Sequence, residues 1–213
     1  MELIEFRMLK NSLPDEADAF LERSSDGRVT LMSDMLSAIR SLSDAYGVSG
    51  MLERFWDMFV VDAFIGNKDR NNGNWGLLSR KGEIMGLAPV YDNGNSFFNK
   101  RRASMNGARA QDSRLVEQDA VGTAVSVYRR DDGRHVKPFD YIGEGLDADC
   151  NAALSRFMGR IDMAEVMALV DSIPESALNF DVLDPRTREF TKKILTERYD
   201  RALLTAWEKI GSR

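Results

Sequence analysis

Residues 51–78 read "MLERFWDMFVVDAFIGNKDRNNGNWGLL", a run of large apolar side chains that passes directly into a run of Asn, Asp and Gly. The apolar positions of residues 51–65 cover most of the circumference of a helix, and a helix that is apolar nearly all round is a buried one. Gly66 suits a left-handed C-cap. The sequence therefore predicts a central helix that ends at Gly66 and holds the polar loop that follows.

A short hairpin is predicted directly after this loop. "WGLL" (75–78) and "IMGLAPVY" (84–91) have the pattern of strands, and Gly82 between them suits a turn. A second polar cluster, "DNGN" (92–95), follows the second strand. The residues that enter and leave an antiparallel hairpin lie at its open end, where opposed positions are roughly 5 Å apart. Asn74 and Asp92 are therefore predicted to be near neighbours.

The rest of the chain predicts one domain over residues 1–213, of class α+β and mainly α. Residues 3–6 could form a short strand, and the segment 99–150 is polar and weakly periodic, so we expect it to be long and irregular. Helical spacing of apolar residues or helix start signals mark the remaining predicted helices, at 14–25, 31–47, 151–160, 161–173 and 187–210. The C-terminal half is thus predicted to be a helical bundle.

Composition excludes several classes of function. The 213 residues are 43% hydrophobic, enough for one sizeable core, but no apolar run is long enough to cross a bilayer and the N-terminus lacks a secretion-type apolar segment, so we expect a cytoplasmic protein without a membrane partner. One cysteine, Cys150, and one histidine, His135, cannot build a Cys/His zinc cluster. A net charge of −5 argues against general nucleic-acid binding. Carboxylate and amide oxygens are left as ligands, and they favour Mg²⁺ or Ca²⁺.

Three oxygen-bearing side chains combine into one candidate site. Phosphoryl transfer from a nucleotide needs Mg²⁺ between the phosphates and a carboxylate that orients the attacking hydroxyl. Mg²⁺ takes one or two protein carboxylates and completes its shell with phosphate and water, a role that fits Asp92 and Asn74. Asp69 is then free to face the acceptor hydroxyl. Its D-x-x-x-x-N spacing to Asn74 is that of the protein-kinase catalytic loop.

This part of the chain resembles the C-terminal, catalytic part of the HipA-like serine/threonine kinases, in particular their compact bacterial branch. The similarity is specific over residues 55–98 and weaker along most of the remaining chain. In that family the loop usually reads D-R-H-x-x-N, and the later Asp sits in a short "YD" segment that replaces the D-F-G of other kinases. The resemblance implies that Asp69 is the catalytic base, that Asn74 and Asp92 bind Mg²⁺ with ATP, and that the acceptor is a protein Ser or Thr hydroxyl.

The chain departs from the family pattern in the loop and upstream of it. Asn71 stands where the family commonly has His, and "NGN" follows Asp92 where Gly-Ser or Cys-Gly-Ser is usual, but neither change removes a carboxylate. Family members also carry a small N-terminal lobe with a phosphate-covering loop and an ATP-contacting Lys, and residues 1–50 contain no Gly-rich loop. We therefore expect a kinase large lobe whose small lobe is missing and could be supplied by another chain or by a regulatory protein. The apolar surface that such a lobe covers should lie near the N-terminal segment and the hairpin.

Other interpretations stay open. The noncatalytic alternative is a truncated kinase-like lobe that acts as a protein-binding module. Asn, Asp and Gly are also ordinary turn formers. A Ca²⁺ loop of EF-hand type is disfavoured, because its sixth and twelfth positions would be Asn72 and Leu78 instead of Gly and Glu. For Asp62 we favour a structural role, and Arg70 could pair with a nearby carboxylate.

The remaining charged residues near the loop have a functional and an ordinary interpretation. Lys68 could touch phosphate or be an exposed loop residue. Lys100, Arg101, Arg102 and Arg109 could meet substrate or be a solvated run. His135 is expected at the surface.

Overall fold

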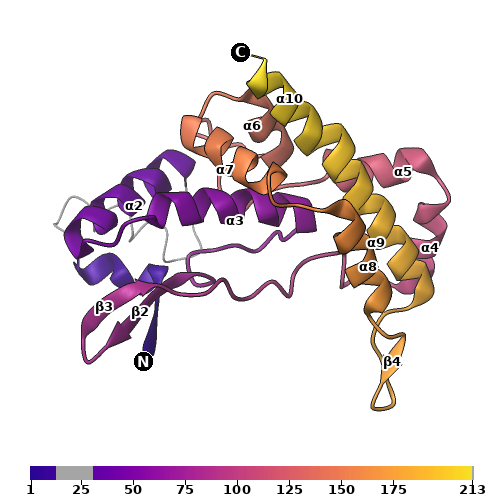
Figure 1. Cartoon of the computed structure of the whole chain (residues 1–213), viewed down its shortest axis with the longest axis horizontal. Helices are drawn as coiled ribbons and strands as arrows, with labels where there is room; N and C mark the ends of the chain where they lie inside the picture. The colour runs from indigo at the N-terminus through magenta and orange to yellow at the C-terminus, as the bar shows by residue number, and fades with distance from the viewer. Residues whose placement is uncertain (13–30, 213) are drawn as a thin grey trace.

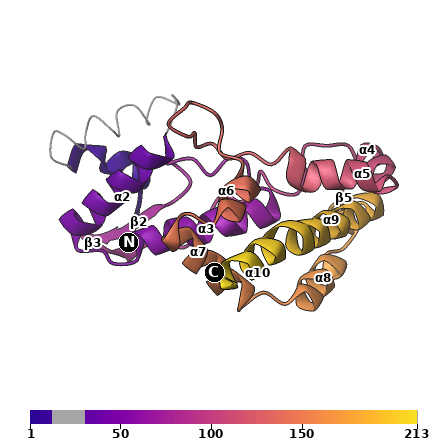
Figure 2. The ribbon, with the colours of Figure 1, turned by 90° about the horizontal axis from the view of Figure 1, so that it is seen from above.

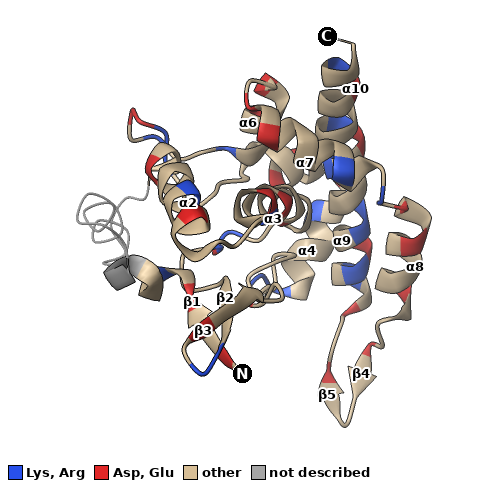
Figure 3. Cartoon of the chain, turned by 60° about the vertical axis from the view of Figure 1, so that its left-hand side comes forward, with Lys and Arg blue, Asp and Glu red and all other residues tan. Residues whose placement is uncertain are grey.

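Helix α3 (Met51–Ile65) runs through the middle of the molecule in the computed structural model, which describes residues 1–12 and 31–212. Figure 3 shows this helix nearly end-on, with the small sheet below it and other helices on its remaining sides. Trp56 and Val60 are fully buried, and Phe55 is 2% exposed. Burying each large apolar side chain contributes about 1.5–3 kcal/mol, so α3 is the main element of the core, as its sequence predicted.

The sheet has three antiparallel strands in the order β1 (Glu2–Glu5), β2 (Gly76–Arg80) and β3 (Glu83–Leu87). The β2–β3 hairpin confirms the predicted one, although β3 ends at Leu87 and a bulge lies between Leu78 and Ser79. Ile4 pairs with Leu77, which pairs with Leu87, and all three contribute to the hydrophobic core. The predicted N-terminal strand is confirmed as β1, and its pairing fixes β2 from the other side.

Gly76 is where β1 and β2 approach too closely for any side chain. A Cβ atom at this position would lie 2.1 Å from the Ile4 carbonyl oxygen. We expect Gly76→Ala to push β1 off β2 and to lower the free energy of unfolding by about 1–3 kcal/mol, measured by chemical denaturation. Gly143→Ala is the control, because a Cβ there would have no described atom within 4 Å apart from its chain neighbours and the backbone of its own helix. Equal stability of the two variants would contradict the close pairing of β1 with β2.

Other helices surround α3. Helix α2 (Met32–Tyr46) packs against it and ends at Gly47 in a left-handed cap, which confirms the prediction for residues 31–47. The helix predicted over 14–25 lies outside the described residues. A 3-10 segment, η1 (Phe6–Ser12), connects β1 to that part of the chain, and the Phe6 ring stacks on Trp75 with 4.3 Å between centroids. Helices α6 (Pro138–Glu144) and α7 (Ala148–Met158) contact α3 as well.

The prediction of an irregular segment over 99–150 was wrong. This segment forms the short helices α4 (Ala103–Ala110) and α5 (Ser113–Glu117), the π-helical turn η2 (Gln118–Gly122), all of α6 and the start of α7. Ala110, Val116 and Ala120 form a second, smaller core with Phe190 and Ile194 of helix α9 (Pro185–Glu197). Helices this short are stabilised by such tertiary packing and leave little periodic signal in the sequence.

The C-terminal helical prediction is confirmed. Helix α8 (Met163–Ser172) is followed by a small hairpin, β4 (Ser176–Ala177) and β5 (Phe180–Asp181), which extends away from the body of the molecule (Figure 1). Helix α9 (Pro185–Glu197), the π-helical segment η3 (Arg198–Leu204) and helix α10 (Thr205–Gly211) then form one continuous rod (Figure 2). The fold is α+β and mainly helical, as expected. None of the helices described is long and apolar enough to cross a membrane.

Candidate active site

The polar loop starts from a fixed point at the end of α3. Gly66 has φ +74° and its amide donates to the Asp62 carbonyl oxygen at 2.8 Å. A Cβ atom on Gly66 would lie 2.6 Å from the Arg198 guanidinium. Glycine is therefore required here both by the positive φ and by the lack of room for a side chain. The Arg198 guanidinium is buried, and donates to the carbonyl oxygens of Phe64 (3.0 Å) and Ala120 (2.9 Å). The last turn of α3 is thereby tied to η2 and η3.

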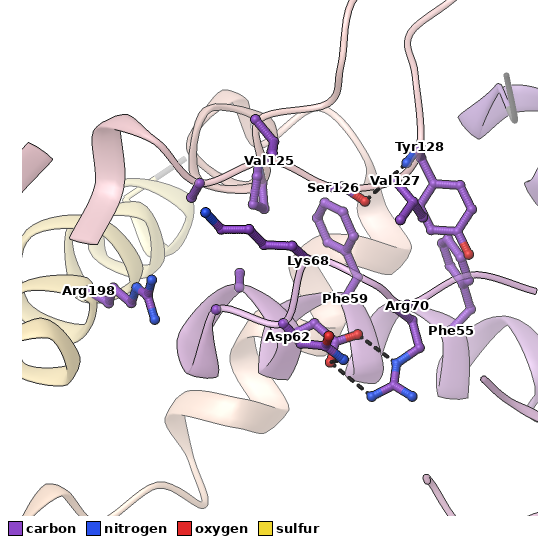
Figure 4. A pocket seen from close by; sticks show the side chains of 15 residues that line it. Phe55, Phe59, Asp62, Lys68, Arg70, Val125, Ser126, Val127, Tyr128 and Arg198 are labelled. Atoms are coloured by element: carbon purple, nitrogen blue, oxygen red, sulfur yellow. Dashed lines mark hydrogen bonds and ion pairs between the residues drawn. The ribbon is translucent and has the colours of Figure 1, made fainter. Parts of the chain in front are cut away.

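Arg70 holds the loop to α3 through a buried ion pair with Asp62. Its Nε donates to Asp62 Oδ2 at 2.8 Å and its Nη2 to Oδ1 at 3.0 Å (Figure 4). Asn67 Nδ2 donates to the same carboxylate at 3.1 Å. Burial raises the pKa of the Asp62 carboxyl, while the hydrogen bonds from Arg70 and Asn67 oppose that shift. The expected pairing of Arg70 and the structural role of Asp62 are both found.

The same guanidinium joins the loop to the segment after the hairpin. Arg70 Nη1 donates to the Asn74 carbonyl oxygen at 2.8 Å and to the Tyr91 carbonyl oxygen at 2.5 Å, and Nη2 donates to the side chain of Asn93. Two carbonyls that share one nitrogen lie close together. The Tyr91 hydroxyl also donates to the Gly73 carbonyl oxygen at 3.1 Å. Arg70 therefore brings Asn74 beside the residues that flank Asp92.

Asp69 is exposed, and hydrogen bonds within the loop orient it. Asn71 Nδ2 donates to Asp69 Oδ1 at 3.1 Å, and the Asp69 amide donates to Asn67 Oδ1, also at 3.1 Å. Because Asn67 is itself bound to Asp62, a chain of hydrogen bonds connects the Asp69 backbone to the buried ion pair. The carboxylate of Asp69 thus projects into solvent from a backbone that is held in place, which is what a group positioning an acceptor hydroxyl requires.

Asn74 and Asp92 differ in burial but both keep an oxygen available. Asn74 is 8% exposed, and its Nδ2 donates to the Asp69 carbonyl oxygen at 2.6 Å. Its Oδ1 accepts no hydrogen bond from any residue that the structure describes. Asp92 is exposed, has φ +55°, and forms neither a hydrogen bond nor an ion pair within the described part of the chain. An L-residue in this conformation costs about 1–2 kcal/mol, which Asp tolerates better than most residues.

The available donor atoms of these two residues are oxygens, which suit a hard cation such as Mg²⁺ or Ca²⁺. Over residues 1–12 and 31–212, no group of three or more His, Cys, Asp and Glu side chains could bind a metal ion. One carboxylate and one amide oxygen do not complete a protein site, but they are sufficient where phosphate and water oxygens supply the remaining ligands. His135, expected at the surface, is exposed.

Several residues that support the site were not identified from the sequence. Tyr91 binds the loop and the Asn93 side chain accepts a hydrogen bond from Arg70. In the sequence, both have the pattern of ordinary residues at a strand end and in a turn. Arg198 lies more than a hundred residues from α3 in the sequence, and no local pattern shows that it is buried. In the basic run, Arg101 and Arg109 both pair with Asp119, the first at 2.5 Å. Both arginines therefore neutralise the buried Asp119 carboxylate of η2.

The chain was compared with protein families, curated proteins and solved structures. No family model matches it. It is 28% identical over 208 residues to the serine/threonine-protein kinase CtkA of Helicobacter pylori, an alignment that covers 95% of this chain and 60% of that protein. The crystal structure of the H. pylori proinflammatory kinase CtkA superposes with a TM-score of 0.83 at 27% identity, over 98% of this chain and 68% of that one. The chain is therefore homologous to a serine/threonine-protein kinase, shares its kinase-like α+β fold, and spans 60% of the length of this curated relative.

Proposed function

We propose that this chain is the catalytic lobe of a HipA-like, ATP-dependent protein serine/threonine kinase. The observation that carries the proposal is the shared Arg70 guanidinium, which holds Asn74 and the flanks of Asp92 together while Asp69 projects from the same loop. In a chain homologous to a kinase, this arrangement supports a role for Asp69, Asn74 and Asp92 in phosphoryl transfer.

Each residue then has a definite task. Asn74 Oδ1 and the Asp92 carboxylate would hold Mg²⁺, which neutralises charge on the phosphates when it is bound. Asp69 orients the acceptor hydroxyl and accepts its proton, and the amide of Asn71 keeps the carboxylate of Asp69 in position. Arg70 and Asp62 take no part in the chemistry. They fix the distance between the two segments, and a shift of about 1 Å between reacting groups can cost a hundredfold in rate.

Exposed apolar side chains near the sheet support the proposal that a small lobe packs there. Large apolar side chains are exposed on and beside β1 and β3: Met1 (82%), Leu3 (46%), Met8 (61%), Met85 (56%) and Val90 (41%). This is the region where the sequence predicted an uncovered apolar surface, and contiguous exposed apolar patches mark interaction sites. We propose that a small lobe covers it, contributed by sequence outside these 213 residues or by a second chain, since the kinase relative is longer.

The isolated 213 residues should be a poor kinase. Without a loop over the phosphates and a lysine for the α and β phosphates, half of the nucleotide cradle is missing. We expect calorimetry with ATP and Mg²⁺ to show weak or undetectable binding, and we expect binding and phosphotransfer to recover when the small lobe is added. Tight ATP binding and multiple turnover by the isolated chain would contradict this. A complex with the small lobe that forms but binds no ATP would favour the noncatalytic protein-binding alternative.

A further inference from the structure

An open pocket of about 540 Å³ lies beside the start of the loop and does not include the proposed magnesium ligands. Gly66 and Lys68 form one wall, and residues of the segment 95–105 form the other. Four of the lining side chains are cations, namely Lys68, Lys100, Arg101 and Arg102, and no carboxylate lines the pocket. The pocket therefore has a strong positive charge, and Lys68 in its lining directly precedes Asp69 in the chain.

Most of this charge is not compensated by the protein. Arg101 Nη1 pairs with Asp119 Oδ2 at 2.5 Å, and Asp119 also binds Arg109. In contrast, Lys68, Lys100 and Arg102 form no ion pair with any residue in the described ranges. Three unpaired cations that converge on one pocket repel each other, and an anion that binds there relieves this repulsion.

Lys68 also lies close to two further cations, Arg101 and Arg198. Its Nζ lies 5.4 Å from the centroid of the Phe98 ring, over which the guanidinium groups of Arg101 (4.3 Å) and Arg198 (5.7 Å) also lie. In Figure 4, Lys68 extends toward the side on which Arg198 lies. Partial burial lowers the pKa of Lys68, and the positive charges of Arg198 and Arg101 lower it further, while the negative charge of Asp119 opposes the shift.

The backbone adds to this positive potential. Helix α4 has eight residues and begins at this pocket, with Arg102 at its N-cap position and no side chain capping its first amides. The first N–H groups of a helix lack partners within the helix, and the helix dipole favours a negative charge next to them. The unpaired cations and the uncapped helix start thus act on the same volume.

From these observations we infer that the pocket binds the phosphate of a phosphoserine or phosphothreonine residue in the protein substrate, next to the hydroxyl that Asp69 receives. This inference rests on the proposed function, because a phosphate site in this pocket makes the kinase prefer substrates that already carry a phosphate near the acceptor hydroxyl. Three cations and a helix start match a dianion better than a single carboxylate. Phe98 and Met105 supply apolar surface for the flanking peptide.

A protein phosphate fits better than a nucleic acid. The chain has a net charge of −5, and Asp119 pairs with Arg101 in the pocket and with Arg109 on α4, so that the uncompensated positive charge is confined to Lys68, Lys100 and Arg102. Nucleic-acid binding relies instead on an extended basic surface that contacts several phosphates.

The test is a binding measurement without ATP or Mg²⁺, so that its result is independent of kinase activity. A glycine-flanked phosphoserine peptide, its unphosphorylated form and a single-stranded oligonucleotide are titrated into the ¹⁵N-labelled chain at low ionic strength. We expect the phosphopeptide to shift the amide signals of Lys68, Ala103 and Ser104, and the unphosphorylated peptide to bind at least about tenfold more weakly. Lys68→Gln and Lys100→Gln should each weaken phosphopeptide binding by about tenfold.

Arg114→Gln is the matched control, because the Arg114 side chain is 88% exposed on α5 and outside the pocket, and it should bind the phosphopeptide normally. Equal binding of both peptides, or no loss on Lys68→Gln and Lys100→Gln in chains that keep their folded spectra, would overturn the inference. Tighter binding of the oligonucleotide, lost on the same substitutions, would also overturn it and assign the pocket to nucleic acid. If the chain proved not to be a kinase, the results expected from these titrations would not change.

Discussion

Asp92→Asn is expected to reduce phosphoryl transfer at least about a thousandfold in an assembly that is active, and Asp69→Asn should have a comparable effect. The first substitution removes the carboxylate proposed to hold Mg²⁺, and the second removes the group that orients the acceptor hydroxyl. Incorporation of labelled phosphate into a protein substrate measures both losses. Near-normal activity of Asp92→Asn would show that the metal is held elsewhere.

These losses should occur with little change in melting temperature. Both carboxylates are exposed, and Asp92 has no hydrogen bond or ion pair among the described residues. Asn adopts the left-handed conformation of position 92, where φ is +55°, at least as readily as Asp does. Asp181→Asn on the β4–β5 hairpin is the control, because it removes an exposed carboxylate far from the loop in the sequence and should preserve activity. A large drop in the melting temperature of Asp92→Asn would mean that its effect is structural.

Arg70→Met should have the largest effect on stability. It leaves the Asp62 carboxylate, 7% exposed, without its ion-pair partner, and removing one member of a buried pair costs about 3–5 kcal/mol. For a domain of this size such a loss lowers the melting temperature by roughly 6–20 °C, which calorimetry can measure. Activity should fall as well, because Asn74 and the flanks of Asp92 lose their common donor.

A double substitution separates stability from positioning. Asp62→Leu combined with Arg70→Met removes both buried charges and should recover part of the lost stability, while activity stays low because the carbonyls of Asn74 and Tyr91 remain unlinked. Arg114→Met is the control, since its ion pair with Asp112 is exposed and should contribute less than about 1 kcal/mol. If Arg70→Met and Arg114→Met were equally stable, the buried pair would not be what holds the loop.

The sequence alone determined the elements whose pattern is local. The apolar periodicity of residues 51–65 defined α3, the C-cap glycine placed its end at Gly66, and Gly82 between two apolar runs defined the hairpin. Because a hairpin has a fixed geometry, it also indicated that the Asn74 and Asp92 segments meet. The roles of Asp69, Asn74 and Asp92 stay predictions, since they depend on bound ligands.

Only the tertiary structure decided what holds these pieces together. The short helices of 103–122 take their stability from packing against Phe190 and Ile194, so their own residues carry little periodic signal. Arg198 is buried because distant segments converge on it, and the fold also brings Lys68 beside Lys100 and Arg102 around one pocket. Helix and turn propensities act over a few residues, whereas burial and charge pairing depend on which distant segments the fold brings into contact.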